Sequence, residues 1–194
     1  MNRAFAYFPG CSLKGSAREY DESTRLVCRA LGIELREVPD WVCCGASSAH
    51  VENTLLATAL SAHALVRASR MGLPLMSPCA MCFARFRQAA LDLKDEALRQ
   101  QVAQALEEEI KEIPPVVHLL QALEGLHIPV RQPLHGLKVA CYYGCLLVRP
   151  VKVTGLDDPE NPTVMDRMVT GLGAEAVPWA FKTECCGAGH QRCR

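Results

Sequence analysis

Most of the eleven cysteines in this 194-residue chain follow a spacing that suits soft-metal chemistry. The first set combines a lone cysteine, an adjacent pair and a C-x-x-C: Cys11, Cys43, Cys44, Cys79 and Cys82. Two neighbouring thiols do little for a core that alanine or valine could not do, so the adjacent pair indicates a functional role. Thiolates are soft ligands that select zinc, copper(I) or iron–sulfur clusters. The set therefore predicts a metal centre.

A second, shorter set repeats the first near the end of the chain. It consists of Cys145 and another adjacent pair, Cys185 and Cys186. The flanking residues repeat as well, since Tyr143-Gly144-Cys145 matches Pro9-Gly10-Cys11 and Cys185-Cys186-Gly187-Ala188 matches Cys43-Cys44-Gly45-Ala46. This self-similarity indicates an internal duplication. The second copy contains Cys193 but no C-x-x-C, so it is expected to be truncated or interrupted.

Three other chemistries compete with an iron–sulfur cluster. A structural zinc ion takes four ligands, so a fifth cysteine is surplus in the first set, whereas a multi-iron cluster can use it as a bridge. Zinc remains an alternative for Cys145, Cys185 and Cys186 with Cys141 or Cys193. A disulfide framework is disfavoured by the odd cysteine count and by the strain of linking neighbours. A redox role for Cys79 and Cys82 alone leaves the adjacent pair unexplained.

Charge and composition exclude several classes of function. The 21 basic and 21 acidic residues cancel, which gives no electrostatic footprint for nucleic acid or an anionic membrane. No stretch approaches the ~18–20 apolar residues of a transmembrane helix, and the apolar start is too short for a signal peptide. A cytoplasmic location is expected. No G-x-G-x-x-G or P-loop motif indicates a nucleotide cofactor.

Strands and helices are expected to alternate through the first two thirds of the chain. Apolar runs predict strands over 4–8, 33–38 and 74–76. Helical patterns cover 16–30, 51–71 and 80–111, the last broken near Lys94-Asp95, and a short helix is expected over 116–123. The first helix is expected to start at a Ser16 cap and to bury Tyr20, Thr24, Val27 and Leu31. Cys28, on the same helix, is expected to be a small buried hydrophobe.

This alternation predicts an α/β fold with parallel sheets, organised as two tandem Rossmann-like units of which the second is incomplete. The expected limits are 1–125 for the first unit, 126–136 for a linker and 137–194 for the second, which opens with a strand over 137–143. Ligands of parallel sheets sit at the carboxyl ends of the strands. Each cysteine loop of the first set follows an expected strand, so its thiols should meet at one edge. Lys14, Arg18 and Lys182 either offset thiolate charge there or are surface residues.

These motifs resemble the cysteine-rich CCG domains in the B-type subunit of heterodisulfide reductase. The first domain is matched by Phe8-Pro9-Gly10-Cys11, Cys43-Cys44-Gly45 and Pro78-Cys79-Ala80-Met81-Cys82. The second is matched by Tyr142-Tyr143-Gly144-Cys145-Leu146-Leu147-Val148-Arg149-Pro150 and Lys182-Thr183-Glu184-Cys185-Cys186-Gly187. The same domain also occurs in iron–sulfur subunits of glycolate and lactate oxidation systems and of some succinate or fumarate enzymes.

The resemblance implies that each complete five-cysteine set holds a noncubane 4Fe-4S cluster, and that two facing clusters split a disulfide by one-electron steps. It implies ligands Cys11, Cys43, Cys44, Cys79 and Cys82 for the first cluster, and only Cys145, Cys185 and Cys186 for the second. The missing C-x-x-C puts the paired-cluster mechanism in question for this chain. The missing segment would also leave apolar surface, which a partner or a second copy of the chain is expected to cover.

The function expected on this basis is that of an oxidoreductase subunit acting on a small disulfide or thiol substrate. Its electrons would come from partner subunits that carry iron–sulfur clusters and flavin. The first alternative is an electron-transfer subunit of a glycolate/lactate or succinate/fumarate oxidoreductase, which binds no substrate itself. The second alternative is a non-catalytic zinc protein.

Overall fold

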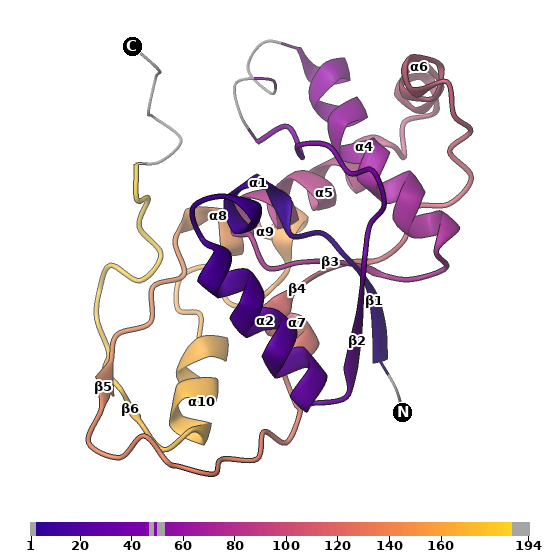
Figure 1. The fold of residues 1–194 in the computed structure, drawn as a ribbon. Helices are drawn as coiled ribbons and strands as arrows, with labels where there is room; N and C mark the ends of the chain where they lie inside the picture. The colour runs from indigo at the N-terminus through magenta and orange to yellow at the C-terminus, as the bar shows by residue number, and fades with distance from the viewer. Residues whose placement is uncertain (1–2, 47–48, 50–52, 188–194) are drawn as a thin grey trace. The chain divides into compact units, whose positions relative to one another are not determined.

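The computed structural model describes residues 3–46, 49 and 53–187. By their internal contacts the residues divide into two compact units, Met1–Ala122 and Leu123–Arg194. Figure 1 shows the ribbon of the chain. The domain limits expected from the sequence, with a linker over 126–136, stay a prediction.

The first unit is built on a parallel sheet whose strands are short. The spatial order is β2-β1-β3-β4, and all three neighbouring pairs run parallel. The strands are β1 (Arg3–Tyr7), β2 (Ile33–Glu37), β3 (Leu75–Ser77) and β4 (Val116–His118). The α/β class and the parallel sheet expected from the sequence are confirmed.

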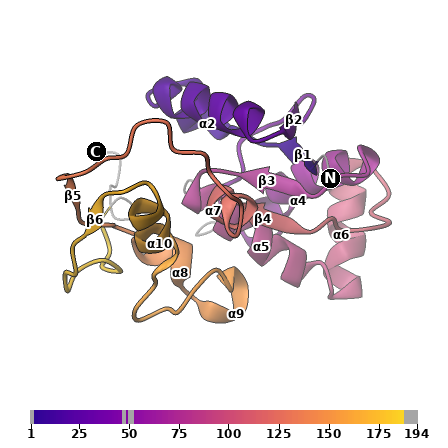
Figure 2. The same ribbon diagram turned by 90° about the horizontal axis from the view of Figure 1, so that it is seen from below.

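Helices cover both faces of this sheet, as Figure 2 shows with α2 on one side and α4 and α5 on the other. The side chains explain the layers, because neighbouring strand residues point to opposite faces. Tyr7 donates a hydrogen bond to Asp21 of α2, and the next residue, Phe8, packs edge-on against Phe86 of α5. The helices of this unit are α1 (Gly10–Lys14), α2 (Arg18–Ala30), α4 (Thr54–Arg70), α5 (Ala80–Asp92) and α6 (Glu96–Leu106), followed by α7 (Leu119–Leu123).

Two of these helices begin at side-chain caps. The Asn53 side chain accepts a hydrogen bond from the Leu56 N–H at 3.0 Å, and that of Asp95 accepts one from Leu98 at 2.9 Å. Such caps satisfy amide groups that the first turn leaves without partners. The break between α5 and α6 falls where the sequence predicts it.

The start and the buried face of α2 differ from the expectation. Residues 10–14 form the separate turn α1, and the Ala17 N–H bonds back to the Ser12 carbonyl, so the helix starts at Arg18 without a Ser16 cap. Its buried residues are Thr24 and Cys28, whereas Tyr20 and Val27 are each 42% exposed. Cys28 is fully buried, which confirms its expected role as a core hydrophobe.

The expectation of one short helix over 116–123 was wrong for its first half. Residues 116–118 form β4, because the exposed edge of β3 offers backbone hydrogen bonds there, beginning with Leu75 N–H to the Pro115 carbonyl at 2.8 Å. The helical pattern over 80–111 also ends early. Glu107, with φ 54°, takes the left-handed conformation after α6.

The second unit contains a small parallel pair, β5 (Lys138–Val139) with β6 (Glu175–Ala176). Its helices are α8 (Cys145–Val148), α9 (Val151–Thr154) and α10 (Val164–Gly171). The strand expected over 137–143 is therefore only two residues long. The N–H groups of Tyr143 and Gly144 bond to the Lys182 carbonyl, which lies outside β6.

His118, the last residue of β4, is buried and neutral. Its Nε2 lies 2.9 Å from the Pro78 carbonyl, and its Nδ1 accepts a hydrogen bond from the Leu120 N–H. Both ring nitrogens are therefore used by the neutral Nε2–H tautomer. Burial lowers the pKa of His118 to about 4. The imidazole thus ties β4 to the loop that follows β3.

Acid should destabilise the apo protein through His118. Between the unfolded pKa of 6.5 and the folded value of about 4, the unfolded chain binds the extra proton. The free energy of unfolding should therefore fall as pH drops through this range, by on the order of 3 kcal/mol for this group. Denaturant titrations of wild type and His118→Gln at pH 7 and pH 4.5 measure the effect. Equal pH dependence in the two proteins would contradict it.

Candidate metal centre

Three loops of the first unit bring cysteines to the carboxyl edge of its sheet. Cys11 lies in α1, directly after β1, and the adjacent pair lies in the loop that follows β2. Cys79 immediately precedes α5 and Cys82 lies in its first turn, after β3. Parallel strands open their loops at one edge, which is where ligands of such sheets bind.

The five thiols form one group of interacting side chains. The sulfur atoms of Cys44 and Cys82 are 3.1 Å apart. Side-chain hydrogen bonds that shift thiol pKa values link Cys79 with Cys82, Cys43 with Cys44, and Cys11 with Cys43. The structure thus brings together every residue that the sequence predicts for the first centre. Their role as metal ligands stays a prediction.

The group has a buried side and an exposed side. Cys44 and Cys82 are buried, Cys79 is half-buried, and Cys11 and Cys43 are exposed. The Phe8 ring packs against Trp41 at a centroid distance of 5.2 Å, beside the adjacent pair. A group bound here would be shielded on the sheet side and reachable from the Cys11 side.

Hydrogen bonds between the thiols favour the charged form of two of them. The bond with Cys82, assisted by the N–H groups of Cys82 and Met81, lowers the pKa of Cys79 to about 6 against the effect of burial. The same partner lowers the pKa of Cys44, and its bonds to both raise the pKa of Cys82 itself. Burial raises the pKa of Cys43. Thiolates at neutral pH are the form that binds metals.

The first set holds five thiols, one more than the four ligands that a structural zinc ion takes. Within residues 3–46, 49 and 53–187, no three His, Cys, Asp or Glu side chains are grouped so that they could hold one metal ion. A multi-iron cluster distributes its thiolates over several metal atoms, so its ligands need not converge on one point.

Side chains outside the cysteine motifs hold these loops in place. Ser61 of α4 donates a hydrogen bond to the Cys44 carbonyl at 2.8 Å, and His118 bonds to the carbonyl of Pro78, next to Cys79. Neither residue could be singled out from the sequence. Ser61 stands between Thr58 and His63 in an alanine- and leucine-rich helix, and His118 follows two valines, so only the fold shows what each side chain faces.

Gly10 allows the chain to pass close to the buried thiol. Its φ of +76° belongs to the left-handed region, and a Cβ there would lie 3.2 Å from the Cys82 sulfur. Gly10→Ala should cost ~1–3 kcal/mol of stability, and should also displace Cys82. Gly32→Ala is the matched control, because Gly32 has φ +70° but open space around the site of its Cβ.

The comparison separates backbone strain from pressure on the thiol. Both variants should lose stability in denaturant titrations of the apo protein, whereas only Gly10→Ala should lose metal on reconstitution. Equal metal content in the two variants would contradict the idea that the close approach of Gly10 to the Cys82 sulfur matters for metal binding.

The second unit brings its own cysteines together. The Tyr143 and Gly144 amides bond to the Lys182 carbonyl at 2.8 and 3.1 Å, which sets Cys145 beside the later loop. The Cys145 thiol bonds to Cys185, and burial and this bond raise its pKa. Cys185 and Cys186 are exposed. Cys193 and Ala188 lie outside the described residues.

A groove of about 510 Å³ opens beside Cys145. One wall carries the Arg149–Glu160 ion pair, with an N–O distance of 2.9 Å. The other lining residues are mainly apolar: Leu146, Pro150, Val151 and Pro159. The half-buried Cys145 thiol is therefore reachable from solvent.

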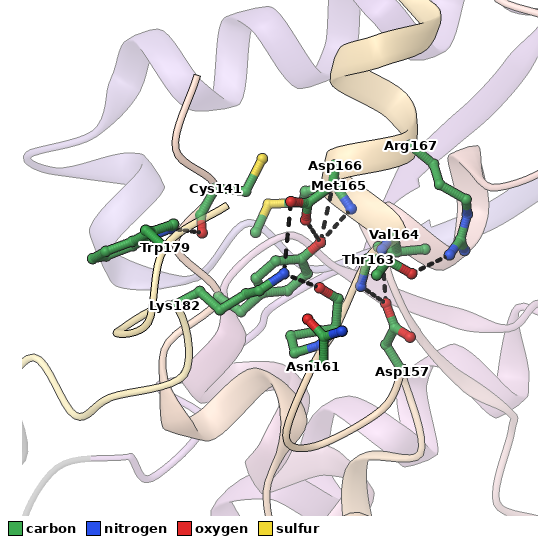
Figure 3. Close-up of polar contacts among 12 residues, drawn as sticks. Cys141, Asp157, Asn161, Thr163, Val164, Met165, Asp166, Arg167, Trp179 and Lys182 are labelled. Atoms are coloured by element: carbon green, nitrogen blue, oxygen red, sulfur yellow. Dashed lines mark hydrogen bonds and ion pairs between the residues drawn. The ribbon is translucent and has the colours of Figure 1, made fainter. Parts of the chain in front are cut away.

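Lys182 serves the interior of the second unit rather than the surface. Its side chain is buried, donates to the Pro162 carbonyl at 2.7 Å and lies 3.6 Å from Asp166, as Figure 3 shows. Asp166 also accepts a hydrogen bond from the Tyr143 hydroxyl. In the first unit, Lys14 forms an ion pair with the half-buried Glu37, and Arg18 donates a hydrogen bond to the Lys14 carbonyl. Lys182, Lys14 and Arg18 thus all have partners other than thiolates.

This network also caps α10. The Tyr143 hydroxyl oxygen accepts hydrogen bonds from the Met165 and Asp166 N–H groups, while Asp157 accepts from Thr163 and Val164 (Figure 3). Four amides at the start of the helix are thereby satisfied from outside it. Of these residues, only Lys182 was a candidate from the sequence for offsetting thiolate charge.

Tyr143→Phe should destabilise the second unit. The change removes the acceptor of two helix-terminal amides and the donor to Asp166, at a cost of ~1–3 kcal/mol. Tyr142→Phe is the comparison, because the Tyr142 ring is exposed and its hydroxyl bonds only to the Glu184 carbonyl in the described structure. Denaturation followed by circular dichroism should show the larger loss for Tyr143→Phe. An equal loss in both would contradict the capping role.

Comparison with sequence families gives one match of high coverage. The profile of the family described as CCG, cysteine-rich domain, matches residues 5–87 and 139–193. The two matched segments contain the first and the second cysteine set. In the parts of the chain that the structure describes, no helix is both long and apolar enough to cross a membrane.

Two curated relatives are similar over nearly the whole chain. One, from Wolinella succinogenes, is the 8-methylmenaquinol:fumarate reductase membrane anchor subunit, 36% identical over 96% of this chain and 68% of its own length. The other, from Methanosarcina acetivorans, is the B-type subunit of the ferredoxin/F420H2-dependent CoB-CoM heterodisulfide reductase, 30% identical over 94% and 64%. The chain spans about two thirds of the length of these relatives.

A solved structure shares the fold. The crystal structure of a hypothetical protein from Helicobacter pylori superposes with a TM-score of 0.69 at 13% identity, over 95% of this chain and 34% of that one. At this identity the likeness concerns the fold alone.

Proposed function

Because the chain belongs to the CCG cysteine-rich domain family, we propose that it is an iron–sulfur electron-transfer subunit of a multisubunit oxidoreductase. The observation that carries the proposal is the group of interacting thiols of Cys11, Cys43, Cys44, Cys79 and Cys82. Five thiols from three loops exceed the four that a zinc ion takes, and all five are accounted for by a bridged cluster.

The proposed cofactor is a noncubane 4Fe-4S cluster held by these five thiolates. When bound, it supplies one-electron transfer. Cys145, Cys185 and Cys186 would contribute to a second centre, at the edge of the groove beside Cys145. The division into CCG domains at 1–125 and 137–194 belongs to the same proposal.

The chain's own residues orient the centre. Cys44 and Cys82 anchor its buried side, with Ser61 and His118 fixing the two loops that carry the buried and half-buried thiols. The rings of Phe8, Trp41 and Phe86 exclude water from the sheet side. Electrons or a sulfur compound would then arrive from the side of the exposed Cys11 and Cys43.

Two reactions are compatible with this architecture. The first is reduction of a small disulfide to two thiols, with two electrons and two protons consumed and the electrons supplied by iron–sulfur and flavin-containing partner subunits. Its reverse, formation of the disulfide, passes two electrons to those partners. The likeness to the heterodisulfide reductase relative suggests this reaction. The second is electron transfer in a fumarate-type complex without a substrate site, which the 36% identity to the fumarate reductase subunit favours.

Metal analysis tests the cofactor. Anaerobically reconstituted protein is assayed for iron, acid-labile sulfide and zinc, with EPR on the same sample. If the first centre holds one complete cluster of the proposed 4Fe-4S type, about four irons and four sulfides per chain are expected. Zinc without labile sulfide would replace the proposal with the structural-zinc alternative.

Cysteine variants test the ligands. Cys43→Ala and Cys79→Ala should each abolish the visible absorption of the reconstituted protein, because each removes one thiol from the group of five. Cys28→Ala is the matched control, since Cys28 is a buried thiol on α2 and stands outside that group. Loss of colour in Cys28→Ala, or retention of full colour in the other two, would contradict the ligand assignment.

The two reactions differ in what the loaded chain does without partners. A disulfide-active subunit, reduced by dithionite, should be reoxidised by a small disulfide such as dithiodiethanol at a rate that depends on disulfide concentration. A pure electron carrier should be reoxidised only by its partner protein or by an artificial acceptor. Stopped-flow absorption of the cluster distinguishes the two.

A further inference from the structure

Ser77 carries a buried hydroxyl group with no partner in the structure. Its side chain is 0% exposed, and its Oγ has no hydrogen-bond partner among the described residues. A buried hydroxyl without a partner costs free energy that folded proteins seldom accept. Where such an atom lies next to a binding centre, it is a candidate donor to the group bound there.

The direction of this side chain follows from the sheet register. Ser77 lies opposite His118 in the β3–β4 pair, and register partners point to the same face. The His118 ring packs against Phe83 of α5 at 5.5 Å. The Ser77 hydroxyl is therefore directed to the α5 side of the sheet. Leu75, two residues earlier, is paired with Ala6 on that same side.

The buried thiols of the first centre lie on this side as well. Cys82 is in the first turn of α5, close to Gly10. Cys44 is held through its carbonyl by Ser61 of α4, which covers the same face. Ser77 is also the last residue of β3, two positions before Cys79. The hydroxyl and the thiols thus share one layer and one end of the sheet.

We propose that Ser77 is a positioning residue that donates its hydroxyl hydrogen to a sulfur atom of the group bound at the first centre, either a ligating thiolate or an inorganic sulfide. The inference rests on the proposed function and assigns that centre a donor outside the cysteine motifs. Hydrogen bonds to the sulfurs raise the reduction potential of a cluster, because they stabilise the extra negative charge of its reduced form.

The test compares Ser77→Ala with Thr24→Val. Thr24 Oγ1 is a second buried hydroxyl without a partner among the described residues, but it lies on α2, which covers the opposite face of the sheet through the Tyr7–Asp21 contact. Both changes remove an unpartnered hydroxyl of the apo protein. Only Ser77→Ala removes the proposed hydrogen-bond donor. Comparing the two variants therefore distinguishes a hydrogen bond to the cluster from an effect on packing.

The midpoint potential of the reconstituted cluster is the deciding readout, measured by EPR-monitored redox titration. Ser77→Ala should disfavour reduction about tenfold relative to wild type, a fall of about 59 mV for a one-electron couple. Ser77→Thr, which keeps the hydroxyl, should restore the wild-type potential, and Thr24→Val should leave it unchanged. An unchanged potential in Ser77→Ala, or an equal fall in Thr24→Val, would overturn the inference.

Denaturant titration of the apo proteins completes the experiment. Ser77→Ala should be at least as stable as wild type, because no hydrogen bond is lost in the apo form. A marked loss of apo stability would mean that Ser77 has a structural partner and would also overturn the inference. The proposed function fails separately, if wild-type protein binds no iron and labile sulfide at all.

Discussion

The parallel pairing of β1 with β2 and β3 is the constraint on which the first centre depends. Parallel strands need crossover connections, and those connections return each loop to the same edge of the sheet. The adjacent pair and the C-x-x-C are separated by more than thirty residues in sequence, yet the Cys44 and Cys82 sulfur atoms are 3.1 Å apart. No local interaction among the cysteines would assemble them without this sheet.

Burial then gives the group its asymmetry. The face covered by α4 and α5 holds Cys44 and Cys82 together with aromatic rings, so one side of the centre is dry and held by Ser61 and His118. In a low-dielectric environment the hydrogen bonds among the thiols strengthen, and they decide which thiols are charged. The opposite side stays open at the exposed Cys11 and Cys43.

The second unit reaches a similar arrangement of cysteines with different supporting contacts. In place of a four-stranded sheet it has one short parallel pair, and a buried Lys182–Asp166 pair with Tyr143 anchors the loops. Buried charges of this kind are stable only when paired and hydrogen-bonded. The Tyr7–Asp21–Arg25 contacts of the first unit use the same residue chemistry, at the helix that follows its first cysteine.

The sequence by itself determined the class of fold and the burial of Cys28, because strand runs and helix periodicity are local patterns. The ligand set that the thiol spacing indicates stays a prediction. It did not determine which face of α2 is buried or that residues 116–118 form a strand, since both depend on neighbours distant in sequence. Only the tertiary structure decided which polar residues hold the cysteine loops. Ser61 and His118 look ordinary in the chain, and their role comes from the carbonyl groups that the fold places opposite them.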